Sequence, residues 1–92
     1  MAHGLFERWR AVIVTCEITV YVRPGCHLCD EALAALQRLG AGRAFTVRVV
    51  DIESDDDLHR AYLERIPVVA LDGEELYDFF LDEDDLCARL DA

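Results

Sequence analysis

Two cysteines separated by two residues, Cys26 and Cys29, lie where a strand pattern gives way to a helix pattern. This spacing lets the two sulfur atoms bond across the first turn of the helix. The start of a helix also offers unpaired backbone N–H groups and a partial positive charge, which favour the thiolate of the first cysteine. Because the thiolate is the form that attacks disulfides, the pair predicts thiol chemistry.

The hydrophobic pattern on both sides of the cysteines predicts the elements that position them. β-Branched and aromatic residues alternate before the motif and predict a strand over residues 15–22, which a Pro-Gly pair then breaks. After the motif, apolar residues at helical spacing predict a helix over residues 28–39, with Gly40 as its C′ residue. A further alternation predicts a second strand over residues 45–51.

The second half of the chain contains signals for a helix followed by a hairpin. Ser54, with three aspartates behind it, is the expected N-cap of a helix that ends near Glu64. Two strands are then predicted over residues 67–71 and 75–80, and an Asp-Gly turn joins them as a hairpin.

A last helix completes the expected fold, and Asp82 is its predicted N-cap. The acidic runs 55–57 and 82–85 both fall at predicted helix starts, so we interpret them as capping residues rather than as acid catalysts. The resulting order is βαβα followed by ββα. This order predicts an α/β fold with one mixed sheet of four strands and helices on its faces.

One domain is expected over residues 15–92, because a chain of 92 residues has room for a single core. Residues 1–10 have no clear period, and residues 1–14 are assigned to an N-terminal extension, with an earlier start of the first strand, within residues 11–14, as the alternative. The apolar run 11–14 is too short for a secretory signal or a membrane span. We therefore expect a cytoplasmic protein whose paired cysteines serve redox or metal chemistry.

Negative charge is concentrated in the second half of the chain. The formal net charge is −10, and residues 51–92 carry three arginines against fifteen acidic residues. Such a field repels nucleic acid and anionic membranes, so neither is an expected partner. We interpret the acidic surface mainly as a solvated face, with a docking surface for a basic partner as the alternative.

The cysteine motif, an Ile-Pro dipeptide before the third strand and the order of elements together resemble the thioredoxin fold. Within that fold, the chain is similar to short bacterial glutaredoxin-like proteins over about residues 15–90. The motif itself reads Cys-His-Leu-Cys. The segments that carry the resemblance are residues 21–32, Tyr62, residues 65–69 and Asp72-Gly73.

The resemblance implies a role for individual residues. Cys26 matches the exposed nucleophile, and Cys29 matches the buried resolving thiol. Pro67 matches a cis-proline that faces the cysteines, and Ile66 before it would present backbone groups to an extended thiol substrate. Arg23 lies where glutaredoxins often carry a basic residue that meets a carboxylate of glutathione.

Some positions depart from the usual glutaredoxin pattern. Arg65 takes the place of a common threonine, and it is expected either to steer an anionic thiol substrate beside Pro67 or to pair with a nearby acid. Residues 74–78 stand where the family commonly has a Gly-Gly pair that holds glutathione. Tyr62 is predicted to pack in the core. No bound cofactor is expected, and glutathione or another low-molecular-weight thiol is a candidate reductant.

The expected mechanism is dithiol–disulfide exchange. Cys26 attacks a substrate disulfide, and Cys29 resolves the mixed disulfide, which leaves Cys26 and Cys29 joined. His27 is predicted to tune the pair, because its protonated form favours the Cys26 thiolate. The expected partners are a disulfide-containing protein or small thiol substrate and a reductase or thiol donor, with the protein itself a monomer.

Two other functions stay open at this point. One is binding of a metal or an iron–sulfur cluster, since a cluster shared between subunits needs only Cys26 from each chain and two thiols from outside the protein. Zinc usually needs four ligands, and Cys16 and Cys87 are predicted to be small apolar core residues, so no metal site is predicted. The other alternative is a non-catalytic adaptor, which would need neither cysteine of the motif.

Overall fold

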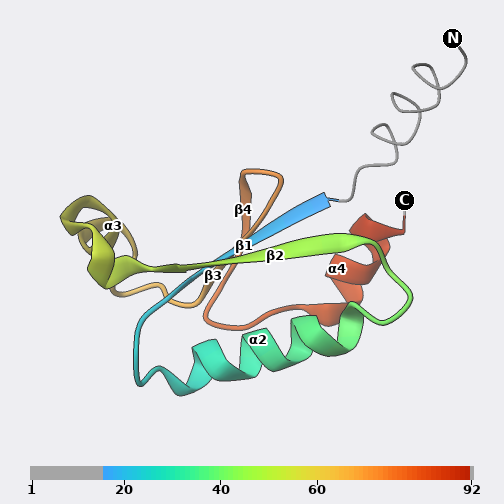
Figure 1. Ribbon diagram of the computed structural model, residues 1–92, viewed down its shortest axis with the longest axis horizontal. Helices are drawn as coiled ribbons and strands as arrows, with labels where there is room; N and C mark the ends of the chain where they lie inside the picture. The colour runs from blue at the N-terminus through green and yellow to red at the C-terminus, as the bar shows by residue number, and fades with distance from the viewer. Residues whose placement is uncertain (1–15, 92) are drawn as a thin grey trace, which may run out of the picture.

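A four-stranded mixed sheet with the strand order β2-β1-β3-β4 forms the framework of the protein (Figure 1). The computed structural model describes residues 16–91, so the extension predicted over residues 1–14 lies outside the described residues. The strands are β1 (Cys16–Val22), β2 (Phe45–Asp51), β3 (Val68–Leu71) and β4 (Glu74–Asp78).

The pairing of the strands brings the C-terminal ends of three strands and the N-terminal end of the fourth together at one end of the sheet. β1 runs parallel to β2 and antiparallel to β3, and β3 is antiparallel to β4. Val22 pairs with Asp51, and both Tyr21 and Asp78 lie in register with Val68. Therefore β1, β2 and β4 end where β3 begins. The predicted mixed four-stranded sheet is confirmed.

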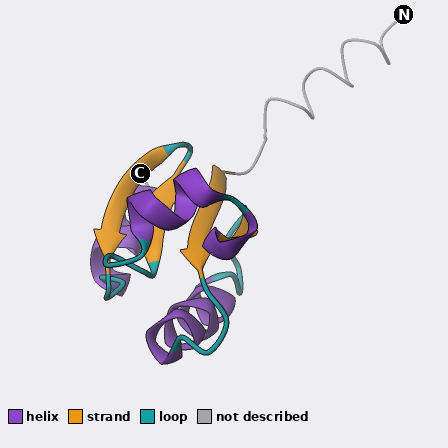
Figure 2. Cartoon of the chain, turned by 90° about the vertical axis from the view of Figure 1, so that its left-hand side faces the viewer, coloured by secondary structure: helices purple, strands orange, loops and turns teal. Residues whose placement is uncertain are grey.

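Within the described residues, three α-helices and one short 3-10 helix complete the predicted order of elements. They are α2 (His27–Leu39), η1 (Ile52–Ser54), α3 (Asp56–Tyr62) and α4 (Glu83–Leu90). α2 lies on the same side of the strands in both views, whereas α3 lies beyond one end of the sheet (Figure 1, Figure 2). In the described residues, no helix is long and apolar enough to cross a membrane.

The hydrophobic core lies between the sheet and the two helices α2 and α4. One buried cluster joins both strands and helices, and each of its side chains is at most 1% exposed. Its members are Ile18 and Val20 of β1, Val69 of β3, Leu36 of α2 and Leu86 of α4. Burial of each such side chain stabilises the fold by about 1.5–3 kcal/mol. This contact fixes α2, and with it the cysteine motif at its start, against the sheet.

β2 is an edge strand, and its alternating valines are less buried than the pattern suggests. Val47 and Val49 are in register with the buried Ile18 and Val20, yet they are 41% and 53% exposed. The helix residues of the buried cluster pack against β1 and β3, so the outer strand β2 is only partly covered.

The prediction that Gly40 is the C′ residue of α2 is wrong. Gly40 is the C-cap of α2 with a right-handed φ of −68°, and its N–H donates to the Leu36 carbonyl at 2.9 Å. The left-handed glycine is Gly42, with a φ of +79°. The chain continues for one more turn before it reverses, and glycine is favoured at the reversal.

The predicted N-cap of the second helix is displaced by one residue. Ser54 belongs to η1, and its hydroxyl donates to the Asp51 carbonyl at 2.6 Å. Asp55 is the cap of α3 instead, because its carboxylate accepts from the N–H groups of Asp57 and Leu58 at 2.8 and 3.2 Å. The capping role predicted for the acidic runs is confirmed, since the Asp82 carboxylate caps α4 in the same way.

The hairpin turn is confirmed, but the fourth strand is shorter than predicted. Asp72 and Gly73 have φ values of +50° and +90°, which suit a tight turn between β3 and β4. β4 ends at Asp78 rather than at residue 80, because Phe79 has a φ of +67° that breaks the extended backbone. Phe79 and Phe80 are 44% and 72% exposed.

Candidate functional site

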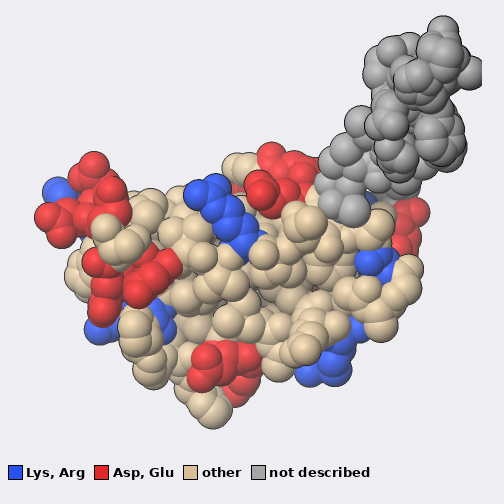
Figure 3. Space-filling model, viewed as in Figure 1, with Lys and Arg blue, Asp and Glu red and all other residues tan. Residues whose placement is uncertain are grey.

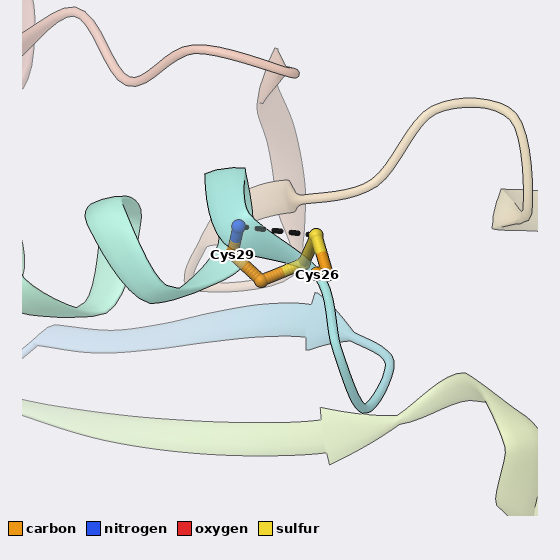
Figure 4. Close-up of a disulfide and its surroundings, with 2 residues drawn as sticks. All are labelled: Cys26 and Cys29. Atoms are coloured by element: carbon orange, nitrogen blue, oxygen red, sulfur yellow. Dashed lines mark hydrogen bonds between the residues drawn. A yellow bond between two sulfur atoms is a disulfide. The ribbon is translucent and has the colours of Figure 1, made fainter.

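The two motif cysteines form a disulfide at the first turn of α2, as predicted (Figure 4). Their Cα atoms are 5.2 Å apart. Cys26 is the N-cap residue, and its Sγ accepts a hydrogen bond of 3.1 Å from the backbone N–H of Cys29. The first sulfur therefore accepts from an N–H group that has no partner within the helix, at the helix start, where a negative charge is stabilised.

The two sulfurs differ in their access to solvent. Cys29 is 1% exposed, whereas Cys26 is half-buried and sits at the surface end of the helix. An incoming sulfur atom can therefore reach Cys26 more easily than Cys29.

Cys16 and Cys87 are unpaired and half-buried, so the prediction that they are core residues is wrong. They lie on the first strand and the last helix, near the margins of the core.

Pro67 lies at the same end of the sheet as the cysteines. The Ile66-Pro67 peptide bond is cis, which confirms the predicted conformation, and Pro67 is buried. Tyr21 near the end of β1 pairs with Val68 at the start of β3. The segment with Cys26, which follows β1, and Pro67, which precedes β3, therefore adjoin neighbouring strands at the same end of the sheet. Contacts of Ile66 and Pro67 with a substrate stay a prediction.

The two arginines predicted to bind a substrate are paired with acids of the chain itself. Arg23 forms an ion pair of 3.2 Å with Glu53. The Arg65 guanidinium binds Asp78 at 3.0 Å and Glu75 at 2.7 Å, and these bonds raise the pKa of Arg65. Of the two roles expected for Arg65, the structure therefore contains the pairing with nearby acids.

Tyr62 belongs to this polar cluster, so the prediction that it packs in the core is wrong. Its ring stacks on Tyr21 with a centroid separation of 4.3 Å, and the Arg65 guanidinium lies 5.4 Å from the ring centroid. Its hydroxyl donates to Glu75 at 2.6 Å, which raises the pKa of Tyr62 and lowers that of Glu75. Glu75 is thirteen residues away in sequence, so no local pattern signals this contact.

His27 points into solvent next to an acid of the same helix. Its side chain is 87% exposed, and Nε2 lies 3.1 Å from a carboxylate oxygen of Glu31. The proposed tuning of Cys26 by His27 stays a prediction.

Within residues 16–91, no group of three or more His, Cys, Asp or Glu side chains is placed to hold a metal ion.

Acidic side chains gather on the face shown in Figure 3, most clearly over α3 at the left of the view, while arginines are spread more widely. The sequence around α4 is also strongly acidic, with five acids and no basic residue in positions 78–85. In the structure Arg65, Arg38 and Arg89 pair with three of these acids, Asp78, Glu83 and Asp85.

A family model matches most of the chain. The model described as a glutaredoxin-like domain (DUF836) matches residues 17–91. A search of curated proteins gives no match.

Solved structures show the same architecture. An NMR structure of a Nitrosomonas europaea protein is 36% identical, with a TM-score of 0.75, and the match covers 85% of this chain and 94% of that one. A crystal structure of an X. campestris protein is 43% identical, with a TM-score of 0.63 and coverage of 80% and 95%. A thioredoxin variant from Halobacterium salinarum, 20% identical with a TM-score of 0.62 and coverage of 85% and 74%, shares the fold. The predicted thioredoxin-like fold is therefore confirmed.

Proposed function

Because this chain belongs to the glutaredoxin-like domain family, we propose that it is a thiol–disulfide oxidoreductase that works through Cys26 and Cys29. One observation carries the proposal. A half-buried cysteine at the N-cap of α2 is bonded to a cysteine that is 1% exposed, so one sulfur is open to attack and the other is shielded. A nucleophile and a resolving thiol need this asymmetry.

The proposed reaction balances two electrons. The Cys26 thiolate attacks one sulfur of the substrate disulfide, which forms a mixed disulfide and releases the first substrate thiolate. Cys29 loses its proton and attacks the Cys26 sulfur, which releases the second substrate thiolate and closes the Cys26–Cys29 disulfide. The dithiol is oxidised and the substrate is reduced. A low-molecular-weight thiol or a reductase then restores the dithiol, and we place this cycle in the cytoplasm.

The start of α2 supports the first step. The Cys29 N–H that contacts Sγ of Cys26 in the disulfide can donate to the Cys26 thiolate in the reduced protein. Cysteines at helix starts and in Cys-x-x-Cys motifs have pKa values of about 3.5–7.5, compared with about 8.5 for a free cysteine. We expect alkylation of reduced Cys26 to titrate in that lower range, whereas Cys29, which is buried, reacts slowly.

A redox titration with thiol trapping and intact-mass measurement tests the proposal. The background carries Cys16→Ser and Cys87→Ser, which leaves only the motif cysteines. We expect this protein to lose two hydrogens reversibly, and the further Cys29→Ser variant to accumulate a mixed disulfide at Cys26. A Cys26→Ser variant is the matched control and traps nothing. If the motif pair stays reduced at every potential, or Cys29→Ser traps no substrate, the proposal is wrong.

A further inference from the structure

An apolar groove lies between α2 and the segment that leads into α4. Leu28, Ala32 and Ala35 line it from α2, and Phe79, Phe80 and Leu81 line it from the other side. Its volume is about 120 Å³. A closed apolar cavity of about 150 Å³ binds benzene, so this open groove suits one side chain such as leucine or phenylalanine. The exchange reaction described above makes no use of it.

The groove begins at the cysteine motif. Leu28 stands between Cys26 and Cys29, and the lining residues of α2 follow at positions 32 and 35. With a rise of 1.5 Å per residue, this face extends along the helix for about 10 Å. An extended peptide covers about 3.3 Å per residue, so a side chain two or three residues from a substrate cysteine reaches the groove while that cysteine is at Cys26.

The fold keeps the aromatic wall of the groove at the surface. Phe79 has a φ of +67°, a conformation that costs a bulky residue about 1–3 kcal/mol. Its N–H is shared between the carbonyls of Pro67, at 2.9 Å, and Arg65, at 3.3 Å. The strained residue is thereby attached to the segment that enters β3, and two aromatic side chains stay exposed beside the candidate redox site.

The charges around the groove are mainly acidic. Glu31 and Glu83 are among its lining residues, and their partners are His27 and Arg38. The aromatic residues themselves lie in the segment 78–85, which holds five acids and no basic residue. Three of these five acids, Asp78, Glu83 and Asp85, pair with arginines, which leaves Asp82 and Asp84 without an arginine partner in the described residues. The chain as a whole carries a net charge of −10, and this field favours a basic partner over glutathione.

We propose that this groove holds an apolar side chain of a basic protein substrate, and that it selects such disulfides over glutathione disulfide. The recognised segment has a leucine or phenylalanine two or three residues from the reacting cysteine, with lysine or arginine beside it. The inference rests on the proposed function and names the substrate class for the same cysteines. Phe80 and Leu28 are its specificity-determining residues, and Glu83 contributes to the charge preference.

Reduction of matched peptide disulfides by the full-length reduced protein tests this inference. One peptide carries a leucine two residues before its cysteine and two lysines beside it. The first control peptide replaces the leucine with serine, and the second replaces the lysines with glutamates. We expect kcat/KM for the basic apolar peptide to exceed that of each control peptide, and that of glutathione disulfide, by at least about tenfold, a difference of 1.4 kcal/mol.

Variants of the protein assign the effect to the groove. Phe80→Ser should remove most of the preference for leucine over serine, and Glu83→Gln should weaken the preference for lysine over glutamate. Val49→Ser changes a valine that is 53% exposed on β2 and does not line the groove, so it should leave both preferences unchanged. Equal reduction of all substrates by the unaltered protein would overturn the inference and leave the proposed function intact.

A binding measurement separates the groove from the chemistry. The Cys26→Ser, Cys29→Ser protein cannot exchange, and NMR shift changes on adding the basic peptide, with its own cysteine replaced by serine, should centre on Leu28 and Phe80. If these shifts appear but no peptide is reduced by the reduced protein, the groove binds the peptide as inferred, whereas the proposed function fails and with it the selection among disulfides. Shift changes elsewhere overturn the inference, as does concentration-dependent dimerisation that Phe80→Ser abolishes, because a second copy would then be the occupant.

Discussion

Arg65, two residues before the cis-proline, donates a 2.7 Å hydrogen bond from Nη2 to a carboxylate oxygen of Glu75. Nε of the same guanidinium binds Asp78 at 3.0 Å. The cation that an anionic thiol would need at this end of the sheet is therefore already neutralised by the chain. This pairing supports the proposed preference for other disulfides over glutathione disulfide.

Release of Arg65 from its acids should improve the use of glutathione. The double variant Glu75→Gln, Asp78→Asn removes both carboxylates, and a single charge contact at 4 Å in water is worth about 1 kcal/mol. We expect kcat/KM for glutathione disulfide to rise by about fivefold. The neutral substrate hydroxyethyl disulfide is the control. An equal rise for both substrates would contradict this explanation, because it would indicate a change in the cysteines instead.

The carboxylates of Glu75 and Asp85 should make the protein less stable in acid. Hydrogen bonds from Tyr62 and Arg65 lower the pKa of Glu75, and those from Tyr77 and Arg89 lower the pKa of Asp85. Because the folded-state pKa is below the unfolded value, this stabilisation is present above about pH 4 and is lost as the pH falls through the folded-state pKa.

Urea unfolding from about pH 5 to about pH 2 measures this loss. Glu75→Gln and Asp85→Asn should each give a shallower decrease in the free energy of unfolding than the unaltered protein. Asp84→Asn, which removes an exposed acid of the same first turn of α4, is the matched control. A slope that neither variant reduces would contradict the prediction.

Tyr77 should contribute stability that disappears in alkali. Burial and the hydrogen bond that its hydroxyl donates to Asp85 raise its pKa to about 12. With the folded-state pKa above the unfolded value of about 10, the contribution is complete below pH 10 and is lost as the pH rises towards 12. Tyr77→Phe should cost about 1 kcal/mol of unfolding free energy at neutral pH.

The comparison of Tyr77→Phe with the unaltered protein, repeated at rising pH, checks this sign. The difference in unfolding free energy should stay constant at neutral and mildly alkaline pH and then shrink. A difference that grows with pH would show that the phenolate, not the phenol, is the stabilised form.

His27→Ala should make the cysteine pair slightly more reducing. The variant removes the imidazole whose protonated form is predicted to favour the Cys26 thiolate and so the reduced form. The side chain is 87% exposed and lies beside Glu31, which limits its influence. We expect a threefold change in the equilibrium constant, about 15 mV for a two-electron couple. Glu31→Gln should shift the potential in the opposite direction. If neither variant changes it, His27 is only a spacer.

Leu86 should be essential to the core. It is 0% exposed in the cluster that joins α4 to α2 and the sheet, so Leu86→Ala should lower the free energy of unfolding by about 2–5 kcal/mol. Val49→Ala, on the exposed side of β2, should change it by at most about 0.5 kcal/mol. Thermal and urea unfolding measure both, and similar losses for the two variants would contradict the assignment of the core.

The elements and the cysteine pair were predictable because their signals are local. Alternation, helical spacing, a Cys-x-x-Cys motif and an Asp-Gly turn each lie within a few residues. The bounds of β1, α2 and β2 follow from them to within one residue. The two misplaced caps at Gly40 and Ser54 reflect a choice between neighbouring residues with similar capping chemistry.

The parts that were missed depend on contacts across the fold. The partners of Arg65 lie ten and thirteen residues away, and the contact of Tyr62 with Glu75 spans thirteen. Phe79 and Phe80 look like the end of a strand because they are apolar. Only the backbone at Phe79 reveals that the strand has already ended and that both rings are exposed.

The register of β1 with β3 has a consequence for biosynthesis. This end of the sheet is complete only when Val68 pairs with Tyr21. The two cysteines precede the strand after Pro67 by about forty residues, so they leave the ribosome well before it. During that interval the nascent chain carries the cysteine pair without the groove that we propose selects its partners. A chaperone or a small thiol in the cell would meet those sulfurs before that groove has formed.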